Sequence, residues 1–369
     1  MTIQDQNHPQ HRQLESAVVI GGTGFIGRHT VRELLDHGYA VTTVSRTEPE
    51  VRLAEPDEVN HVLGDRSKSD TLERAARQAE PDLVVDCAAL YPGDVRMATE
   101  VFADIDAYVY VSSGGVYAAH EIPKREDDTP IHDCTPDQAE DDTMASYGPR
   151  KAACDRETVA AADRGVTAMS VRPTMVYGPK AVSSAGDEAA TTIDKAPSWA
   201  KDLPGLQSHH DYWIDRLNRY NRVVVPGDGT AIWHRVYVED VASAVRLVAE
   251  RGEPGEAYNV ADRRVCTMED VIDLIADALD TSVTVVHASA RELAEVGLDP
   301  DEFVLYHHLG SRYPHILDTC KLAALGWEST PVEESIVKTV EECVASGRDG
   351  AAFDPGRDSE EKLRAKLSG

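Results

Sequence analysis

Hydrophobic positions in the first half of the chain fall into two kinds of segment that alternate along the sequence. Short apolar runs bounded by Gly, Asp and Ser are typical of buried strands. Such runs predict strands at 17–20, 40–45, 60–63, 83–87, 107–112 and 167–171. Longer stretches with apolar residues three and four apart are typical of helices. They predict a helix that ends at Asp36 and further helices that begin at Ser69 and near Tyr147.

This alternation predicts the fold class. Parallel strands joined by helices cover both faces of their sheet, so we expect a doubly wound α/β domain. A polar segment over 180–221 interrupts the pattern, and we interpret it as part of a domain that covers the substrate. Helical spacing returns at 238–250, 268–279 and 332–344. We therefore predict a flexible N-terminus over 1–14, a sheet domain over 15–179 and 232–262, a smaller α/β substrate domain over 180–231 and 263–347, and a charged, solvated tail over 348–369.

The charge of the chain excludes some classes of partner. Its formal net charge is -28 over 369 residues, and only ten of its 37 basic residues are lysine. Nucleic acids and anionic membranes need clustered Lys and Arg, so we expect neither as a partner. An acidic surface poor in lysine stays hydrated in concentrated salt, which favours a halophilic origin. The alternative is an ordinary acidic enzyme.

Cysteine usage and hydropathy predict the compartment. Six cysteines are scattered without a C-x-x-C pair, which is typical of thiols in a reducing compartment. No apolar run approaches the roughly 18 residues that a membrane span requires, and the start of the chain does not resemble a signal peptide. We expect a soluble, cytoplasmic protein.

A glycine-rich turn follows the first predicted strand. In "AVVIGGTGFIG", Gly21, Gly24 and Gly27 lie between a strand and a helix, where backbone N–H groups can approach a pyrophosphate. We predict a dinucleotide site here, with Thr23, Phe25 and Ile26 completing the turn; the alternative is a tight structural turn.

The residues after the next strands indicate which dinucleotide would bind. A carboxylate after the second strand would favour NAD, but this chain has Ser45 and Arg46, which suit the 2′-phosphate of NADP. We therefore favour NADP over NAD. The alternative is that Arg46 is a solvated loop residue with no role in cofactor binding. We expect Asp65 to meet the adenine, with Arg66 beside it. Two small residues after the fourth strand, Ala88 and Ala89, would let the cofactor cross the edge of the sheet.

Candidate catalytic residues follow the fifth predicted strand and begin the next helix. Ser113 stands at the carboxyl end of that strand, where open α/β sheets bind ligands. Tyr147 and Lys151 are four residues apart and so share one helix face. An ammonium group stabilises a nearby phenolate, so Lys151 would help Tyr147 to exchange a proton with a substrate oxygen that Ser113 also contacts.

Seven motifs in this order resemble a known family. They are "GGTGFIG", "VSSGGVY", "YGPRK", "VRPTMVYGP", "VYVEDVASAV", "EAYNVAD" and "LGW". The chain is similar to the extended short-chain dehydrogenase/reductases, which are grouped with the NAD-dependent epimerase/dehydratases. The resemblance implies a Rossmann domain, a catalytic triad of Ser113, Tyr147 and Lys151, and a place for Pro173 below the nicotinamide. It also allows a homodimer.

Two departures from the family pattern narrow the expected activity. Sugar-nucleotide dehydratases of the family carry an Asp-Glu pair where this chain has Gly114 and Gly115, so 4,6-dehydration is disfavoured. Many nucleotide-sugar enzymes carry an Arg-Asp pair where this chain has Trp233 and His234. The next residue, Arg235, is a candidate substitute for that arginine near the nucleotide phosphates.

The remaining polar clusters are given ordinary interpretations. Adjacent histidines in 209–213 and 306–308 lack the spacing of a metal site, so we expect solvated or substrate-lining side chains and no metal. Arg216, Arg219 and Arg222 could meet a phosphate, but spacing of three is more typical of an exposed helix face.

Two classes of function remain. The first is an NAD(P)-dependent oxidoreductase acting on a secondary alcohol or ketone of a sugar-like substrate, most simply a dehydrogenase or reductase, with a nucleotide-sugar epimerase as the alternative. The second is a non-catalytic relative that senses the cofactor or binds RNA. The presence of Ser113, Tyr147 and Lys151 favours an enzyme, and the acidic charge disfavours RNA.

Overall fold

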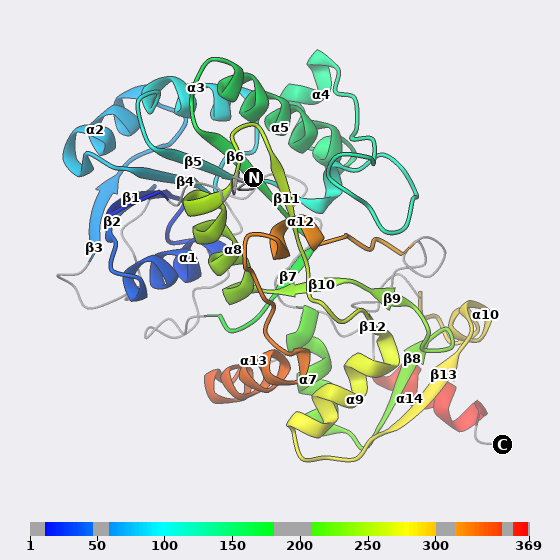
Figure 1. The fold of residues 1–369 in the computed structure, drawn as a ribbon. Coiled ribbons are helices and arrows are strands. Elements are labelled where there is room, and N and C mark those ends of the chain that lie inside the picture. Colours follow the sequence, from blue (N-terminus) through cyan, green and yellow to red (C-terminus); the bar gives the residue numbers. More distant parts are fainter. Residues whose placement is uncertain (1–11, 47–58, 181–208, 300–313, 349–356, 368–369) are drawn as a thin grey trace, which may run out of the picture.

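A seven-stranded sheet forms the larger domain of the computed structural model (Figure 1). The structure describes residues 12–46, 59–180, 209–299, 314–348 and 357–367. The strand order across the sheet is β11-β6-β5-β4-β1-β2-β3, and every pairing is parallel. The strands are β1 Ser16–Ile20, β2 Ala40–Ser45, β3 Val59–Leu63, β4 Leu83–Asp86, β5 Ala107–Val111, β6 Ala168–Pro173 and β11 Ala257–Val260. The predicted doubly wound α/β fold is confirmed.

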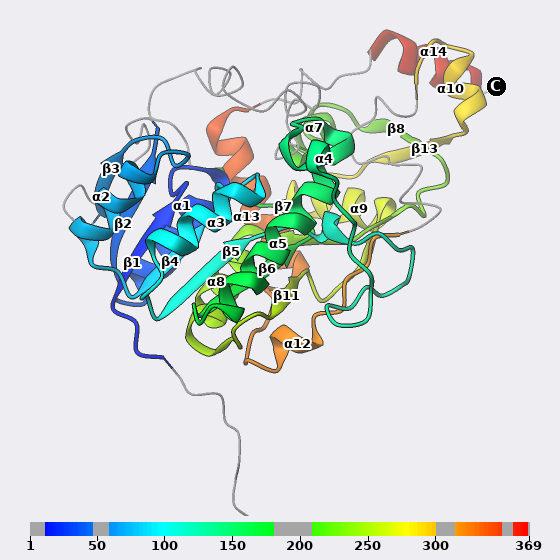
Figure 2. The same cartoon turned by 90° about the horizontal axis from the view of Figure 1, so that it is seen from above.

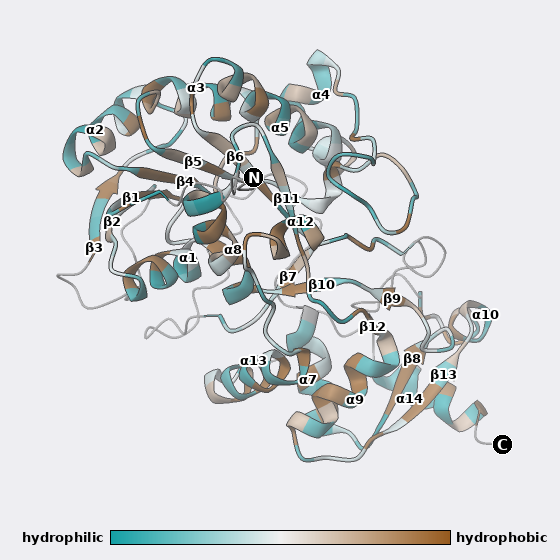
Figure 3. Cartoon of the chain, in the orientation of Figure 1, coloured by the Kyte–Doolittle hydropathy of each residue, from teal (hydrophilic) through white to brown (hydrophobic). Residues whose placement is uncertain are grey.

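Helices cover both faces of this sheet (Figures 1 and 2). Alternate side chains of a strand point to opposite faces, so in β1 Val19 packs with α1 and α8, whereas Val18 packs with α2, α3 and α5. These helices are α1 Phe25–Asp36, α8 Val238–Arg251, α2 Ser69–Ala79, α3 Pro92–Val101 and α5 Tyr147–Asp163. The inner strands β1, β4 and β5 are buried and apolar along most of their length (Figure 3). The edge strand β3 differs, because Asn60 and Leu63 are exposed.

The order of the strands fixes where a ligand can bind. From β1 the chain continues outward through β2 and β3, and then returns to β4 on the other side of β1. The crossovers therefore leave in opposite directions at the carboxyl ends of β1 and β4. Open α/β sheets bind their ligands at such a switch point.

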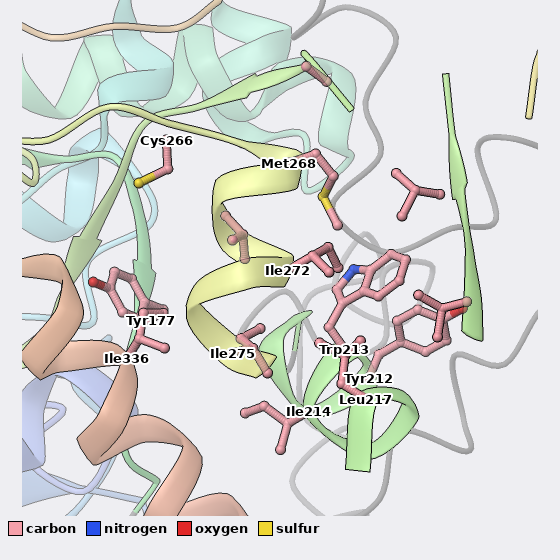
Figure 4. Close-up of a cluster of buried hydrophobic side chains, with 14 of the residues drawn as sticks. Tyr177, Tyr212, Trp213, Ile214, Leu217, Cys266, Met268, Ile272, Ile275 and Ile336 are labelled. Atoms are coloured by element: carbon pink, nitrogen blue, oxygen red, sulfur yellow. The ribbon is translucent and has the colours of Figure 1, made fainter. Parts of the chain in front are cut away.

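The smaller domain packs helices around three short pairs of strands. Its pairs are β8 Arg222–Pro226 with β13 Thr284–Ala288, β9 Ile232–Trp233 with β12 Cys266–Thr267, and β7 Met175–Tyr177 with β10 Arg235–Tyr237. Its helices include α7 His209–Arg219, α9 Met268–Ala278, α10 Ala290–Ala294, α13 Val332–Ser346 and α14 Arg357–Leu367. Trp213 is fully buried in its core beside Ile272 and Ile275 (Figure 4). Short elements complete the fold at α4 Pro136–Glu140 and α12 Cys320–Ala323.

Both ends of the chain differ from the sequence prediction where the structure describes them. The Arg12 side chain donates to the carbonyl oxygens of Ala249 and Gly252, and Leu14 is buried, so residues 12–14 are not flexible. The predicted solvated tail is wrong over 357–367, because α14 buries Glu360 and Leu363 against the smaller domain. The sequence did not indicate α14, because most of its residues are charged and only Glu360 and Leu363 are buried. No described helix is both long enough and apolar enough to cross a bilayer.

Candidate active site

The strand β1 ends in the glycine-rich turn that leads into α1. Gly21 has a φ of +80°, which favours glycine. A Cβ on Gly27 would lie only 2.1 Å from the carbonyl oxygen of Gly21, so the close approach of helix and turn requires glycine there. Gly24 is the N-cap of α1, and the first turn holds no acidic residue. The first N–H groups of α1 and the positive end of its dipole are therefore suited to an anion such as a pyrophosphate.

The other predicted residues of this turn divide into two kinds. Thr23 is half-buried at the turn itself. Phe25 is buried with its ring edge-on to that of His29, at 5.8 Å between centroids, and Ile26 is partly buried against the same core. The side chains of Phe25 and Ile26 therefore anchor α1, and their backbone forms the turn.

Asp86, at the end of β4, shapes the second turn at the switch point. Its carboxylate accepts hydrogen bonds from the backbone N–H groups of Ala88 at 3.0 Å and Ala89 at 2.9 Å. Ala88 then lies against the first turn, since a Cβ on Gly21 would be 3.0 Å from the Cβ of Ala88. Ala88 and Ala89 follow β4, as the sequence predicted, and Ala88 lies beside the glycine-rich turn.

Arg66 has a different surrounding from the one expected of a cofactor contact. Its guanidinium pairs with Asp86 and lies 2.8 Å from Asp94. Tyr108 also donates to Asp86, at 3.1 Å. Arg66 thus neutralises the carboxylates of Asp86 and Asp94, and through Asp86 it stabilises the turn that follows β4.

Ser45 ends β2, and Arg46 follows it at the edge of the same site. Arg46 is exposed, and Asp65 is exposed nearby. The backbone N–H of Ser67 holds the pKa of Asp65 below its usual value, and the positive charge of Arg46 acts in the same direction. His61, on β3, places Nε2 3.4 Å from the Ser45 hydroxyl. His61 is not predicted from the sequence, because its contact with Ser45 depends on the register of two strands.

Ser113 and Tyr147 are brought together around Gly115. The backbone N–H of Gly115 donates to Ser113 Oγ at 3.1 Å. A Cβ on Gly115 would lie 3.3 Å from Ser113 Oγ and 3.4 Å from Cε1 of Tyr147, so both side chains border this one glycine. Gly148 allows the contact, because its own Cβ would be 2.7 Å from the carbonyl oxygen of Gly115. The first turn of α5 therefore docks directly on the turn that follows β5.

Lys151 lies one helical turn beyond Tyr147 and is buried. Its Nζ donates to the carbonyl oxygens of Val111 at 3.0 Å and Ala89 at 3.3 Å. The ammonium group also lies 4.3 Å from the centre of the Tyr110 ring. The ends of β4 and β5 thus fix one positive charge at the carboxyl edge of the sheet.

A network of buried polar side chains connects α5 to β6 and β11. Arg172, on β6, donates to Asp155 of α5 at 2.7 Å and to the hydroxyl of Tyr117 at 3.0 Å. Tyr117 in turn donates to Asn259 of β11 at 2.7 Å. These contacts are not predicted from the sequence. The sequence signal that could have identified them is that Tyr117, Arg172 and Asn259 all lie within the quoted family motifs.

The amino-acid sequence matches the NAD dependent epimerase/dehydratase family over residues 17–103 and 95–261. This chain belongs to that family. The predicted resemblance to the extended short-chain dehydrogenase/reductases is therefore confirmed, and the chain is a member of a family of NAD-dependent enzymes.

Relatives and solved structures of the family extend beyond the matched region. The chloroplast stem-loop binding protein of 41 kDa b from Arabidopsis thaliana is 22% identical over 273 residues, covering 71% of this chain and 62% of that protein. The dTDP-glucose 4,6-dehydratase of Salmonella typhimurium is 24% identical over 356 residues, covering 88% of this chain and 91% of that protein. The crystal structure of Thermus thermophilus UDP-glucose 4-epimerase in complex with NAD has a TM-score of 0.61 at 22% identity, covering 89% of this chain and 99% of that chain. At such identity the structural likeness shows the fold.

In this family member, the segment before α8 faces inward. His234 donates through Nε2 to the carbonyl oxygen of Asp262 at 2.7 Å, because Nδ1 accepts the N–H of Leu317 at 3.1 Å. Arg235 is 1% exposed and lies 5.0 Å from the centre of the Tyr177 ring. The structure therefore does not support Arg235 as a substitute contact for nucleotide phosphates.

Two further expectations on α7 are wrong. Arg216 is buried, not part of an exposed face, and pairs with Glu360 of α14. His210 is buried and contacts Arg235, so it is not solvated. Tyr306, His307 and His308 lie outside the described residues. Within the described ranges, no three His, Cys, Asp or Glu side chains are grouped as metal ligands.

Proposed function

We propose that this chain is an NAD(P)-dependent dehydrogenase or reductase acting at a secondary alcohol or ketone of a sugar-like substrate. The observation that carries the proposal is the meeting of Ser113 and Tyr147 around Gly115, with Lys151 on the next turn of the same helix. These groups lie at the carboxyl edge of the sheet, beside the turns that suit a dinucleotide.

Each of the three residues has a distinct role in this proposal. The Gly115 N–H occupies a lone pair of Ser113 Oγ, so the hydroxyl proton is directed to a substrate oxygen. Tyr147 exchanges a proton with the same oxygen as it changes between alcohol and carbonyl. Lys151, fixed by two carbonyl oxygens, supplies the positive charge that favours the phenolate of Tyr147. The nicotinamide cofactor, when bound, supplies or accepts the hydride.

We propose NADP as the preferred cofactor. No carboxylate ends β2, and Arg46 is exposed at that position, next to Ser45. An exposed guanidinium and a hydroxyl suit a phosphate better than two ribose hydroxyls. NAD is the alternative, because the related epimerase structure contains NAD.

The substrate class rests on the relatives. Two of them are named for sugar nucleotides, dTDP-glucose and UDP-glucose. The burial of Arg235 weakens recognition of the nucleotide diphosphate, so a sugar or polyol without a nucleotide fits this chain better. A nucleotide-sugar epimerase is the second candidate, since the same three residues serve that reaction in the family.

A non-catalytic role has less support. One relative is named for stem-loop binding, but the net charge of -28 opposes association with RNA. Ser113, Tyr147 and Lys151 are all present, and a binding protein has no use for their arrangement.

All six cysteines are free thiols, which supports a reducing compartment such as the cytoplasm.

A cofactor-coupled assay tests this proposal. The purified chain would be incubated at high salt with NADP or NAD and, in turn, UDP-glucose, dTDP-glucose, glucose, galactose and glucose 1-phosphate. A dehydrogenase accumulates reduced cofactor, measured by its absorbance, whereas an epimerase changes the sugar without net reduction. Failure to convert any of these sugars, together with unchanged thermal stability in the presence of either cofactor, would overturn the proposal.

A further inference from the structure

A histidine from a distant part of the chain lies against the turn that carries Ser113. A Cβ on Gly114 would be 2.8 Å from Nε2 of His315, and 3.3 Å from the carbonyl oxygen of Pro173. The imidazole therefore fills the space that a side chain at position 114 would need. Nε2 is buried in this contact.

The segment around His315 is held in place on both sides. Lys124 donates its backbone N–H to Ile316 at 2.8 Å and accepts that of Asp318 at 2.9 Å. His234 accepts the N–H of Leu317 at 3.1 Å. The backbone next to His315 is thus held by hydrogen bonds, so the imidazole ring can limit the movement of the turn on which it packs.

The imidazole is neutral in the working range of pH. Burial lowers the pKa of His315 to about 4, and the neighbouring Lys124 and His234 act in the same direction, whereas a hydrogen bond with the backbone of Gly114 opposes the shift. Above about pH 5 the ring carries no charge, so His315 is not expected to act as an acid in the reaction.

We propose that His315 is a positioning residue for Ser113, packing on Gly114 so that the Ser113 hydroxyl faces the substrate oxygen. This inference rests on the proposed function, because it assumes that Ser113 contacts the substrate. Ser113 Oγ is fixed by the N–H of Gly115. Since Gly114 lies between them in the chain, a shift of Gly114 moves both the hydroxyl and its hydrogen-bond donor.

Four variants test the pairing of His315 with Gly114. His315→Ala removes the ring, Gly114→Ala places a methyl group against it, and the double variant lets that methyl group occupy the vacated space. His315→Gln keeps a polar atom near the position of Nε2. Gly93→Ala is the matched control, because a Cβ there meets nothing within 4 Å.

The assay uses whichever sugar of the panel above the wild type converts fastest. We expect His315→Ala and Gly114→Ala each to lower kcat about ten- to a hundredfold, with the affinity for NADP unchanged, because a displacement of about 1 Å near the reacting atoms has such effects. The double variant should have a higher kcat than the product of the two single effects predicts, and a smaller loss of melting temperature than the sum of the two single losses. His315→Gln should retain most of kcat and the wild-type pH profile.

Other results would overturn this inference. If the wild type converts a sugar and His315→Ala has unchanged kcat, or if the two substitutions are additive, His315 does not position Ser113. If His315→Gln removes one limb of the pH profile, His315 acts as an acid or base instead. If the wild type converts no sugar, the proposed function fails and this role for His315 fails with it.

Discussion

Ser113 and Lys151 are held by backbone groups before any ligand binds. The N–H of Gly115 fixes the Ser113 hydroxyl, and two strand-end carbonyl oxygens fix the Lys151 ammonium. Groups fixed in this way need little reorganisation when charge develops on a substrate oxygen. A single residue, Gly115, makes the arrangement compact, since any larger side chain would start between Ser113 and Tyr147.

Cofactor choice is also decided at the scale of residues. If Ser45 and Arg46 bind the 2′-phosphate, they add a charge-assisted contact worth about ten- to a hundredfold in affinity for NADP over NAD. Arg46→Ala should remove most of that preference, and Ser45→Asp should reverse it, because the carboxylate repels the phosphate and accepts bonds from the ribose. Titrations with both cofactors at one salt concentration measure this. Equal weakening of both cofactors by Arg46→Ala would show that Arg46 does not contact the 2′-phosphate.

At the scale of elements, one buried carboxylate of α14 connects this helix to α7 and β8 of the smaller domain. Glu360 pairs with Arg216 of α7 and accepts the backbone N–H of Val224 at 2.8 Å. Glu360→Ala would leave the buried Arg216 without this partner, which should lower the free energy of unfolding by about 3 to 5 kcal/mol. Urea unfolding measures the change, with Asp358→Ala, at an exposed position of the same helix, as the control. Equal stability of the two variants would contradict the role assigned to α14.

The junction of α8, β10 and β11 predicts a dependence of stability on pH. Burial raises the pKa of Asp262 to about 7, although Arg235 opposes the shift. Since the folded state then binds a proton more tightly than the unfolded state, this stabilisation is present below about pH 4 and is lost as the pH rises to about 7. Relative to Asp262→Asn, the wild type should lose up to about 4 kcal/mol over that range. If the free energies of unfolding of the two proteins change by the same amount across this pH range, the effect is ruled out.

The elements that the sequence predicts best are those with one dominant pattern. The strands β1, β4 and β5 are nearly continuous apolar runs, and α5 begins at Tyr147 as expected. By contrast, Asp155, Arg172, Tyr117 and Asn259 are far apart in sequence, and only the parallel sheet brings them together. The contact of His315 with Gly114 is of the same kind, because neither residue type nor spacing indicates it.

At the scale of the whole molecule, charge is the dominant feature. A net charge of -28 places many carboxylates within a Debye length of one another at low salt. If this surface is an adaptation to salt, the melting temperature should rise from low to molar KCl as the repulsion is screened. Thermal unfolding across a KCl series, with the same series in an uncharged osmolyte as the control, measures this. A flat or falling melting temperature would count against a halophilic origin.

The proposed reaction depends on the phenol of Tyr147, so its removal is the most direct test. Tyr147→Phe keeps the ring beside Gly115 and removes the hydroxyl alone. With the sugar that the wild type converts fastest, turnover should fall by roughly two to four orders of magnitude, the usual span of general acid–base catalysis, while the affinity for the cofactor stays almost unchanged. Turnover close to that of the wild type, at equal cofactor saturation, would contradict the assignment of Tyr147 and with it the proposed mechanism.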